Sequence, residues 1–202
     1  MKRRIALAGF AGLAVAPWLL TACARPPVAM HWYELRSPPP GPVPAARAGD
    51  GARWEVASTV VLPGALDRET LVVASGAASL QPLTGHRWVE PLRDAIPRLL
   101  VADLAVLRGP GLVWRAPVLA GVNPARRLRV EIVTLMADTG RQTLSLQARW
   151  WLTDSRPNGA APRLGQANID IPLADASVDA LAAAHRLALW QLAVRIVESA
   201  PV

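Results

Sequence analysis

The chain has 202 residues, of which 52% are hydrophobic, and a formal net charge of +7 at pH 7. It contains one cysteine, Cys23, which excludes an internal disulfide and makes a poor metal site on its own. The cations are scattered along the sequence, which argues against nucleic acid as a partner.

The N-terminus has the order of segments that is typical of a secretory signal. Residues 2–4 are basic, residues 5–20 are mainly apolar, and small residues follow just before Cys23. The stretch LTAC at residues 20–23 resembles a bacterial lipobox. In proteins with that pattern the cysteine thiol receives a diacylglyceryl group, the signal is cut before the cysteine, and the new N-terminus is acylated, for example with palmitate. We therefore predict a signal peptide at residues 1–22 and lipidation of Cys23; the alternative is an inert cysteine that ends a hydrophobic anchor.

Lipidation would attach the protein firmly to a membrane without a spanning helix, because two or more acyl chains hold where one binds only marginally. Among proteins with this pattern, an aspartate after the cysteine favours retention at the inner membrane. Ala24 stands there in this chain. The resemblance thus implies an anchor in the periplasmic face of the outer membrane.

Residues 23–52 are predicted to form a lipidated, proline-rich tether. The stretch SPPPGPVP favours an extended, semi-rigid polyproline path. A proline-rich binding motif for a partner is the alternative. Before it, residues 32–35 could add one short strand.

Residues 53–202 are predicted to form one α/β domain with a mixed sheet and two main helices. Strands are expected at residues 53–62, 71–75 and 78–83. An apolar stripe then predicts a helix at residues 92–107, with a kink at Pro97 or a fresh start capped by Asp94. A strand at residues 112–117 follows, and this order favours a crossover with parallel pairing.

The second half of the domain has the clearest patterns. Residues 128–137 and 143–152 alternate between apolar and polar side chains around a compact loop, which predicts an antiparallel hairpin. Residues 166–171 could form the last strand. The closing helix, at residues 174–199, has Asp175 or Ser177 as its cap.

No motif for catalysis is found in the sequence. The histidines His31, His86 and His185 have no partner ligand at metal-binding spacing, and His185 lies on an apolar helical stripe, as a core histidine would. A nucleophile elbow, a phosphate-binding glycine loop and a dinucleotide fingerprint are missing. We therefore expect no enzyme activity, no catalytic or metal site, and no cofactor other than the lipid on Cys23.

Two features are candidate contacts with a partner. Arg126 and Arg127, with Arg129 close behind, form the densest cluster of cations; a solvated loop end is the alternative. Trp150 and Trp151 are adjacent in a predicted strand, so they should face opposite sides of the sheet. Helices on both faces would cover both indoles, whereas an open face would leave Trp151 free for an interface.

The residues from 54 to 152 resemble the PqiC-type auxiliary lipoproteins of ABC-type transport systems. The likeness is carried by the order of several stretches rather than by a single signature. They are VVLPGALDRETLVV, HRWVEPLRDAIPRLLVADLAVL, LRVEIVTLMADTGRQTLSLQARWWLTD, the closing helix, and YEL after the lipobox.

That resemblance implies a non-catalytic partner of MCE-domain proteins, which move lipids or other hydrophobic compounds between the two membranes. Two other functions stay open from the residues: a free-standing envelope lipoprotein that binds peptide or lipid, and a periplasmic enzyme. The sequence does not identify the transported molecule or the oligomeric state, and a homo-oligomer is one of the open alternatives. The presence of neighbouring genes for a permease, an ATPase and an MCE protein would separate these functions.

Overall fold

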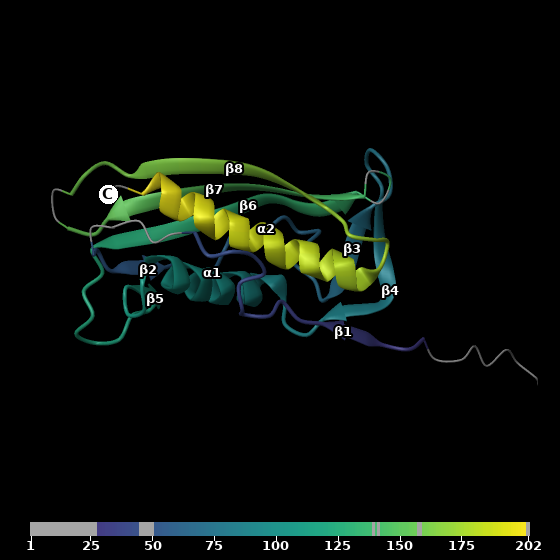
Figure 1. Cartoon of the computed structure of the whole chain (residues 1–202), viewed down its shortest axis with the longest axis horizontal. Coiled ribbons are helices and arrows are strands. Elements are labelled where there is room, and N and C mark those ends of the chain that lie inside the picture. The colour runs from purple at the N-terminus through teal and green to yellow at the C-terminus, as the bar shows by residue number, and fades with distance from the viewer. Residues whose placement is uncertain (1–27, 45–50, 139, 141, 157–158, 201–202) are drawn as a thin grey trace, which may run out of the picture.

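The computed structural model in Figure 1 describes residues 28–44, 51–138, 140, 142–156 and 159–200. The predicted signal peptide and Cys23 lie outside these residues, so their assignment stays a prediction.

One mixed sheet contains the eight strands of the described residues. The pairs β3–β4, β6–β7 and β7–β8 are antiparallel, whereas β1–β4, β2–β5, β2–β6 and β3–β6 are parallel. This confirms the predicted fold class. The strands are β1 (His31–Tyr33), β2 (Trp54–Val56), β3 (Thr70–Ala74), β4 (Leu80–Trp88), β5 (Val113–Arg115), β6 (Arg126–Asp138), β7 (Thr143–Asp154) and β8 (Arg163–Pro172).

Strand β6 determines the two ends of the molecule. Its 13 residues reach about 40 Å at the usual rise of a strand. The start of β6 pairs with β2, and its last residue, Asp138, pairs with Ala74 of β3. Consequently β2 and β5 lie at one end of the molecule, which we call the β2 end, and β3, β4 and β1 lie at the other, the β1 end (Figure 1).

A β-bulge keeps one side of β6 apolar from Leu128 to Ala137. Leu128, Val130 and Ile132 alternate with polar residues and are buried, and a register shift follows between Ile132 and Thr134. After the shift, Leu135 and Ala137 are the buried residues. The extra residue thus returns the alternation to the same face after it would have moved to the opposite one.

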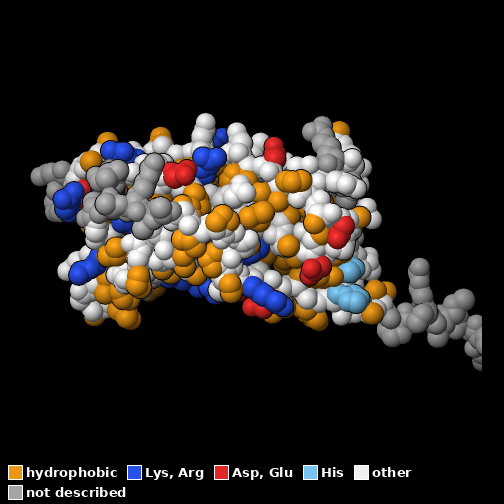
Figure 2. Space-filling view, in the orientation of Figure 1, with side chains coloured by type: hydrophobic (Ala, Val, Ile, Leu, Met, Phe, Trp, Pro, Cys, Tyr) orange, Lys and Arg blue, Asp and Glu red, His pale blue; other side chains and the backbone are white. Residues whose placement is uncertain are grey.

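Both helices cover this apolar face. Helix α2 (Val178–Ser199) packs on β7 and β8, and helix α1 (Leu92–Arg108) packs on β2, β5 and α2. Leu99 and Leu104 are fully buried, which confirms the predicted stripe of α1. In the part of the chain that the structure describes, the polar side of β6 and β7 has no helix over it, so the sheet has one open face. Figure 2 shows the helix-covered side, where hydrophobic side chains lie over α2 among scattered charges.

Helix α1 does not start afresh after Asp94, which was one of the two predicted alternatives. It begins at Leu92, and Pro97 lies inside it, so Asp94 belongs to the first turn and does not cap a new helix. Helix α2 begins at Val178, after Ser177, which is one of its two predicted caps: the Oγ atom of Ser177 accepts a hydrogen bond from the Ala180 amide at 3.1 Å. By length and composition α2 could span a membrane, but 67% of its apolar window is buried inside the domain.

The crossover through α1 joins different strands from those expected. Strand β4 is longer than predicted and ends only at Trp88, four residues before α1. The strand after α1, β5, pairs in parallel with β2 instead of β4. The strand after α1 is therefore paired in parallel, as predicted, but its neighbour is β2, the first strand of the predicted domain, and not the strand just before α1.

The segment after β1 differs most from the expected tether. Residues 34–44, which we call the strap, run across the two helices, and Leu35 is buried in the core. The strap ends beside α2, where Pro42 and Pro44 lie near Trp190. The prediction of a free proline-rich tether over residues 23–52 is therefore wrong for residues 34–44, which belong to the folded domain.

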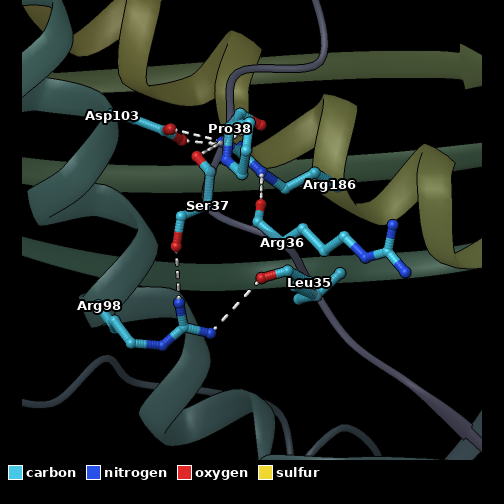
Figure 3. Close-up of polar contacts among 7 residues, drawn as sticks. All are labelled: Leu35, Arg36, Ser37, Pro38, Arg98, Asp103 and Arg186. Carbon is cyan, nitrogen blue, oxygen red and sulfur yellow. Dashed lines mark hydrogen bonds and ion pairs between the residues drawn. The ribbon is translucent and has the colours of Figure 1, made fainter.

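Arginine side chains hold the strap by its backbone (Figure 3). The guanidinium of Arg186 donates hydrogen bonds to the carbonyl oxygens of Arg36 (2.6 Å), Ser37 (3.1 Å) and Pro38 (3.3 Å). From α1, Arg98 reaches the carbonyl of Leu35 (3.4 Å) and the Oγ atom of Ser37 (3.2 Å). Contacts with main-chain oxygens explain why a prolyl run can be fixed here without a regular strand.

A buried ion pair positions Arg186. Its guanidinium meets the carboxylate of Asp103 of α1 at 2.6 and 2.9 Å, and both side chains are almost fully buried. Burial raises the pKa of Asp103, while its hydrogen bonds with Arg186 act in the opposite direction. The pair therefore links α1, α2 and the strap through groups that would be costly to leave unpaired.

Candidate partner-binding groove

The uncovered side of the β6–β7 hairpin, which we call the open face, carries the polar residues of the alternation. Arg127 and Arg129 are exposed and alternate with the buried Leu128 and Val130. Across the ladder, Arg129 pairs with Trp151. Sequence reasoning had proposed Arg127 and Trp151 as partner contacts and had noted Arg129 close to Arg127. The structure brings these three residues together.

Arg126 does not join this group. Neighbouring residues of a strand point to opposite sides of the sheet, so Arg126 shares the side of the buried Leu128. Its side chain is half-buried at the β2 end. The predicted pair Arg126 and Arg127 is thus divided between the two faces of the sheet.

The tryptophan pair divides in the predicted way. Trp150 is buried, and its Nε1 donates to the Oγ atom of Ser199 in α2 at 3.2 Å. Trp151 is half-buried on the open face. One indole therefore packs the helix onto the sheet, and the other remains available at the surface.

A groove of about 940 Å³ lies around Trp151 at the β2 end. Its floor is formed by the hairpin residues Arg127, Arg129, Trp151 and Thr153, and its walls by the segment 57–61 and Pro162. The segment after β2 is fixed by a parallel bridge between Val61 and Glu131 and by the Arg115 guanidinium, which donates to the Ser58 carbonyl at 3.1 Å. The wall formed by the segment 57–61 is thus held in place by neighbouring strands.

The groove combines aromatic, apolar and cationic groups. Val61 is 64% exposed at its wall. The Nε of Arg127 donates to the carboxylate of Glu55 at 2.7 Å, and this contact aims the guanidinium while its side chain stays 64% exposed. Arginine and tryptophan are the side chains that most often provide the anchoring contacts of protein interfaces. The arrangement suits docking of an apolar segment that carries an acidic group.

The histidines offer a different arrangement from the one their spacing suggested. His31 and His86 are 55 positions apart, yet the β1–β4 ladder stacks their rings at 5.1 Å, and the Tyr33 hydroxyl meets Nδ1 of His86 at 2.8 Å. Parallel strand pairing, which the sequence spacing does not reveal, creates this cluster. Among the residues that the structure describes, no group of three or more His, Cys, Asp or Glu side chains could hold a metal ion.

His185 is the core histidine that was predicted. Its Nδ1 lies 2.8 Å from the Leu181 carbonyl, and its ring packs edge-on against Trp88 at 5.2 Å. Burial lowers the pKa of His185 to about 4, so the ring is neutral near pH 7. A neutral ring that donates within its own helix has a structural role.

Sequence reasoning missed Asp103 and Arg186. Each is a charged residue within the apolar part of a helix, in the stretches LLVADLAVL and AAAHRLALW. A single buried charge of this kind needs a partner. The signal that could have predicted the Asp103–Arg186 pair was the presence of opposite charges on the apolar sides of the two helices.

The sequence places the chain in a family. The sequence profile of the ABC-type transport auxiliary lipoprotein component family matches residues 33–197. The chain therefore belongs to the ABC-type transport auxiliary lipoprotein family, which confirms the suspected resemblance. The match begins in β1, two residues before the buried Leu35, in agreement with a strap that is part of the domain.

Solved structures share the fold. One uncharacterized protein aligns with a TM-score of 0.67 at 15% identity, over 84% of this chain and 97% of the other. A protein from Xanthomonas campestris aligns with a TM-score of 0.66 at 20% identity, over 83% of this chain and 92% of the other. At these identities the likeness establishes the fold alone. Comparison with curated proteins gave no match.

Proposed function

We propose that this protein is a non-catalytic docking component of an MCE-type ABC transport system for lipids or other hydrophobic compounds. In this proposal Cys23 carries a diacylglyceryl group and an N-acyl chain, and these lipids anchor the protein in the periplasmic face of the outer membrane. The groove around Trp151 binds the MCE-domain protein. Membership of an auxiliary lipoprotein family supports a role beside a transporter instead of a reaction.

The position of the groove is the observation that carries this proposal. The groove lies at the β2 end, whereas the chain enters the domain at the β1 end, next in sequence to the proposed anchor. The length of β6 separates the two ends by about 40 Å. A membrane anchor at one end and a recognition surface at the other suit a protein that receives a partner crossing the periplasm.

Site-specific crosslinking tests the partner. A photoreactive amino acid at Trp151 should capture an MCE-domain protein from intact cells, identified by mass spectrometry. The same probe at Val106, which is 47% exposed on α1, is the matched control and should not capture it. Deleting the gene should impair the envelope barrier much as deleting the partner does. Equal capture from both positions, or turnover of a small substrate by the purified protein without any capture, would contradict docking through this groove.

Lipid labelling tests the anchor separately. The thiolate is the group that takes the lipid, so Cys23→Ser should remain unprocessed or become soluble and should incorporate no labelled fatty acid. Normal incorporation in this variant would contradict acylation at Cys23. Loss of the label together with retained crosslinking in detergent extracts would show that the groove acts independently of the anchor.

A further inference from the structure

Three exposed apolar side chains lie where the described chain begins. Val28 and Trp32 are each 56% exposed and Met30 is 43% exposed. They are alternate residues of the segment that leads through β1, so in an extended chain they project to one side. We call these three residues the β1 patch.

The β1 patch is fixed on the domain. Gly85 has a φ of +82°, and a Cβ atom there would lie 2.7 Å from the Ala29 carbonyl oxygen and 2.8 Å from Cγ1 of Val28. The chain before β1 thus packs directly against the backbone of β4, at a place where only glycine leaves enough room. At the edge of the sheet, β1 also pairs residue by residue with His86, Arg87 and Trp88.

Covalent reach brings the β1 patch close to the proposed anchor. Five residue steps separate Cys23 from Val28, and they span at most about 18 Å when fully extended. A free tether up to residue 52 would have reached several times farther, but the strap holds residues 34–44 on the helices. An acylated Cys23 therefore keeps the β1 end next to the lipid.

We propose that the β1 patch is a membrane-contact surface that inserts into the boundary between headgroups and acyl chains. The proposal rests on the acylation of Cys23. Tryptophan concentrates at this boundary because its ring is apolar and its N–H is polar. The exposed Arg36 on the strap lines the same hollow as Trp32 and places a cation near the patch, where anionic headgroups would attract it. Arg87, which is paired in register with Trp32, already has Glu69 as its partner at 3.1 Å.

The consequence is a defined orientation of the domain. The acyl chains alone would anchor the protein but leave it free to tilt about a short linker. Contact of the β1 patch with the lipid points the β2 end, and the groove with it, into the periplasm. The β1 patch therefore orients the domain, while most of the membrane affinity comes from the lipid.

The test uses the full-length, acylated protein in vesicles of phosphatidylethanolamine and phosphatidylglycerol. Cys23 is blocked by its lipid, so Met30→Cys or Val61→Cys supplies one free thiol for an environment-sensitive fluorophore. Val61 is the matched control, because it is an exposed aliphatic residue at the β2 end. Mass spectrometry of the Cys23 peptide verifies the acyl groups in each sample.

We expect iodide in the buffer to quench the fluorophore at position 30 several-fold less than the one at position 61. Spin-labelled lipids should quench position 30 and leave position 61 unaffected. Trp32→Ser should reverse much of this protection, whereas Leu164→Ala, at a 73% exposed apolar residue far from β1, should not.

Three results would overturn the inference. Equal quenching at the two positions in a fully acylated protein would overturn the lipid contact and leave the proposed anchor intact. Protection of position 30 from iodide without quenching by spin-labelled lipids would show that a second copy of the chain, instead of lipid, covers the patch. Absence of acyl groups on Cys23 would overturn the proposed anchor and this inference together.

Discussion

The two sides of the β6–β7 hairpin share one backbone but carry different kinds of side chain. On one side Leu128 and Val130 lie under the helices, and on the other Arg127, Arg129 and Trp151 lie at the groove. The folded state depends on the first side, so its chemistry is restricted to apolar side chains. The second side has no helix over it in the described residues, so its side chains are available for the proposed docking. The difference predicts that changes on the helix-covered side alter stability, whereas changes on the open face alter binding.

The largest loss of stability is expected for Arg186→Leu. This change leaves the Asp103 carboxylate buried without its partner and also releases the strap carbonyls, which should lower the free energy of unfolding by about 3–5 kcal/mol. Urea denaturation measures it. The double variant Asp103→Leu/Arg186→Leu removes both charges and should recover part of the loss. A double variant less stable than Arg186→Leu would contradict the unpaired charge as the cause.

Next comes Leu104→Ala, at a fully buried position of α1. The lost contacts and the cavity should lower the free energy of unfolding by about 2–5 kcal/mol. Val106→Ala is the matched control, because Val106 lies on the same helix but is 47% exposed. Thermal unfolding of both variants measures the contrast. An unchanged melting temperature for Leu104→Ala would mean that the assigned buried side of α1 is wrong.

His185 should make the covered side sensitive to acid. Its folded pKa is about 4, below the usual value of 6.5, so the unfolded chain binds the proton more readily. Stability from this group is present above pH 6.5 and is lost as the pH falls from 6.5 to 4, by about 3 kcal/mol in total. Denaturation at a series of pH values should show this loss, and His185→Phe should flatten it. An equal loss in the variant would assign the acid sensitivity to other groups.

The smallest effect on stability is expected on the open face. Arg127→Ala removes a surface ion pair with Glu55, which contributes less than about 1 kcal/mol. The same change should still reduce crosslinking from Trp151 to the partner, because the groove loses its aimed cation. Chemical denaturation measures the effect on stability and crosslinking yield measures the effect on binding, both on one preparation of the variant. A large fall in stability with normal crosslinking would reverse the assignment of the two faces.

Local patterns in the sequence predicted most of the elements. Alternation identified β6 and β7, the apolar stripes identified α1 and α2, and the cap of α2, Ser177, was one of the two predicted. Each of these depends on neighbours within a few residues. The placement of both helices on one face could not be predicted in this way, because it depends on which strands pair across long stretches of sequence.

The candidate site was predicted in part for the same reason. Arg127 and Trp151 were identified by residue type, but the division between Arg126 and Arg127 follows from the strand register, which fixes the side of every residue. The strap was misread because a proline-rich composition is typical of spacers. The side chains that fix it, Arg98 and Arg186, lie far along the chain.

The strap also has a consequence for the order of events as the protein is made. The hydrogen bond from Arg186 to the Arg36 carbonyl joins residues that are 150 positions apart, so it can form only after nearly the whole chain has emerged. Contacts between such distant residues are also slow to form. Until Arg186 is available, the strap has no partner for the carbonyls of residues 36–38. Docking of the strap is therefore a late step of folding, and it joins the segment next to the proposed anchor to the rest of the domain.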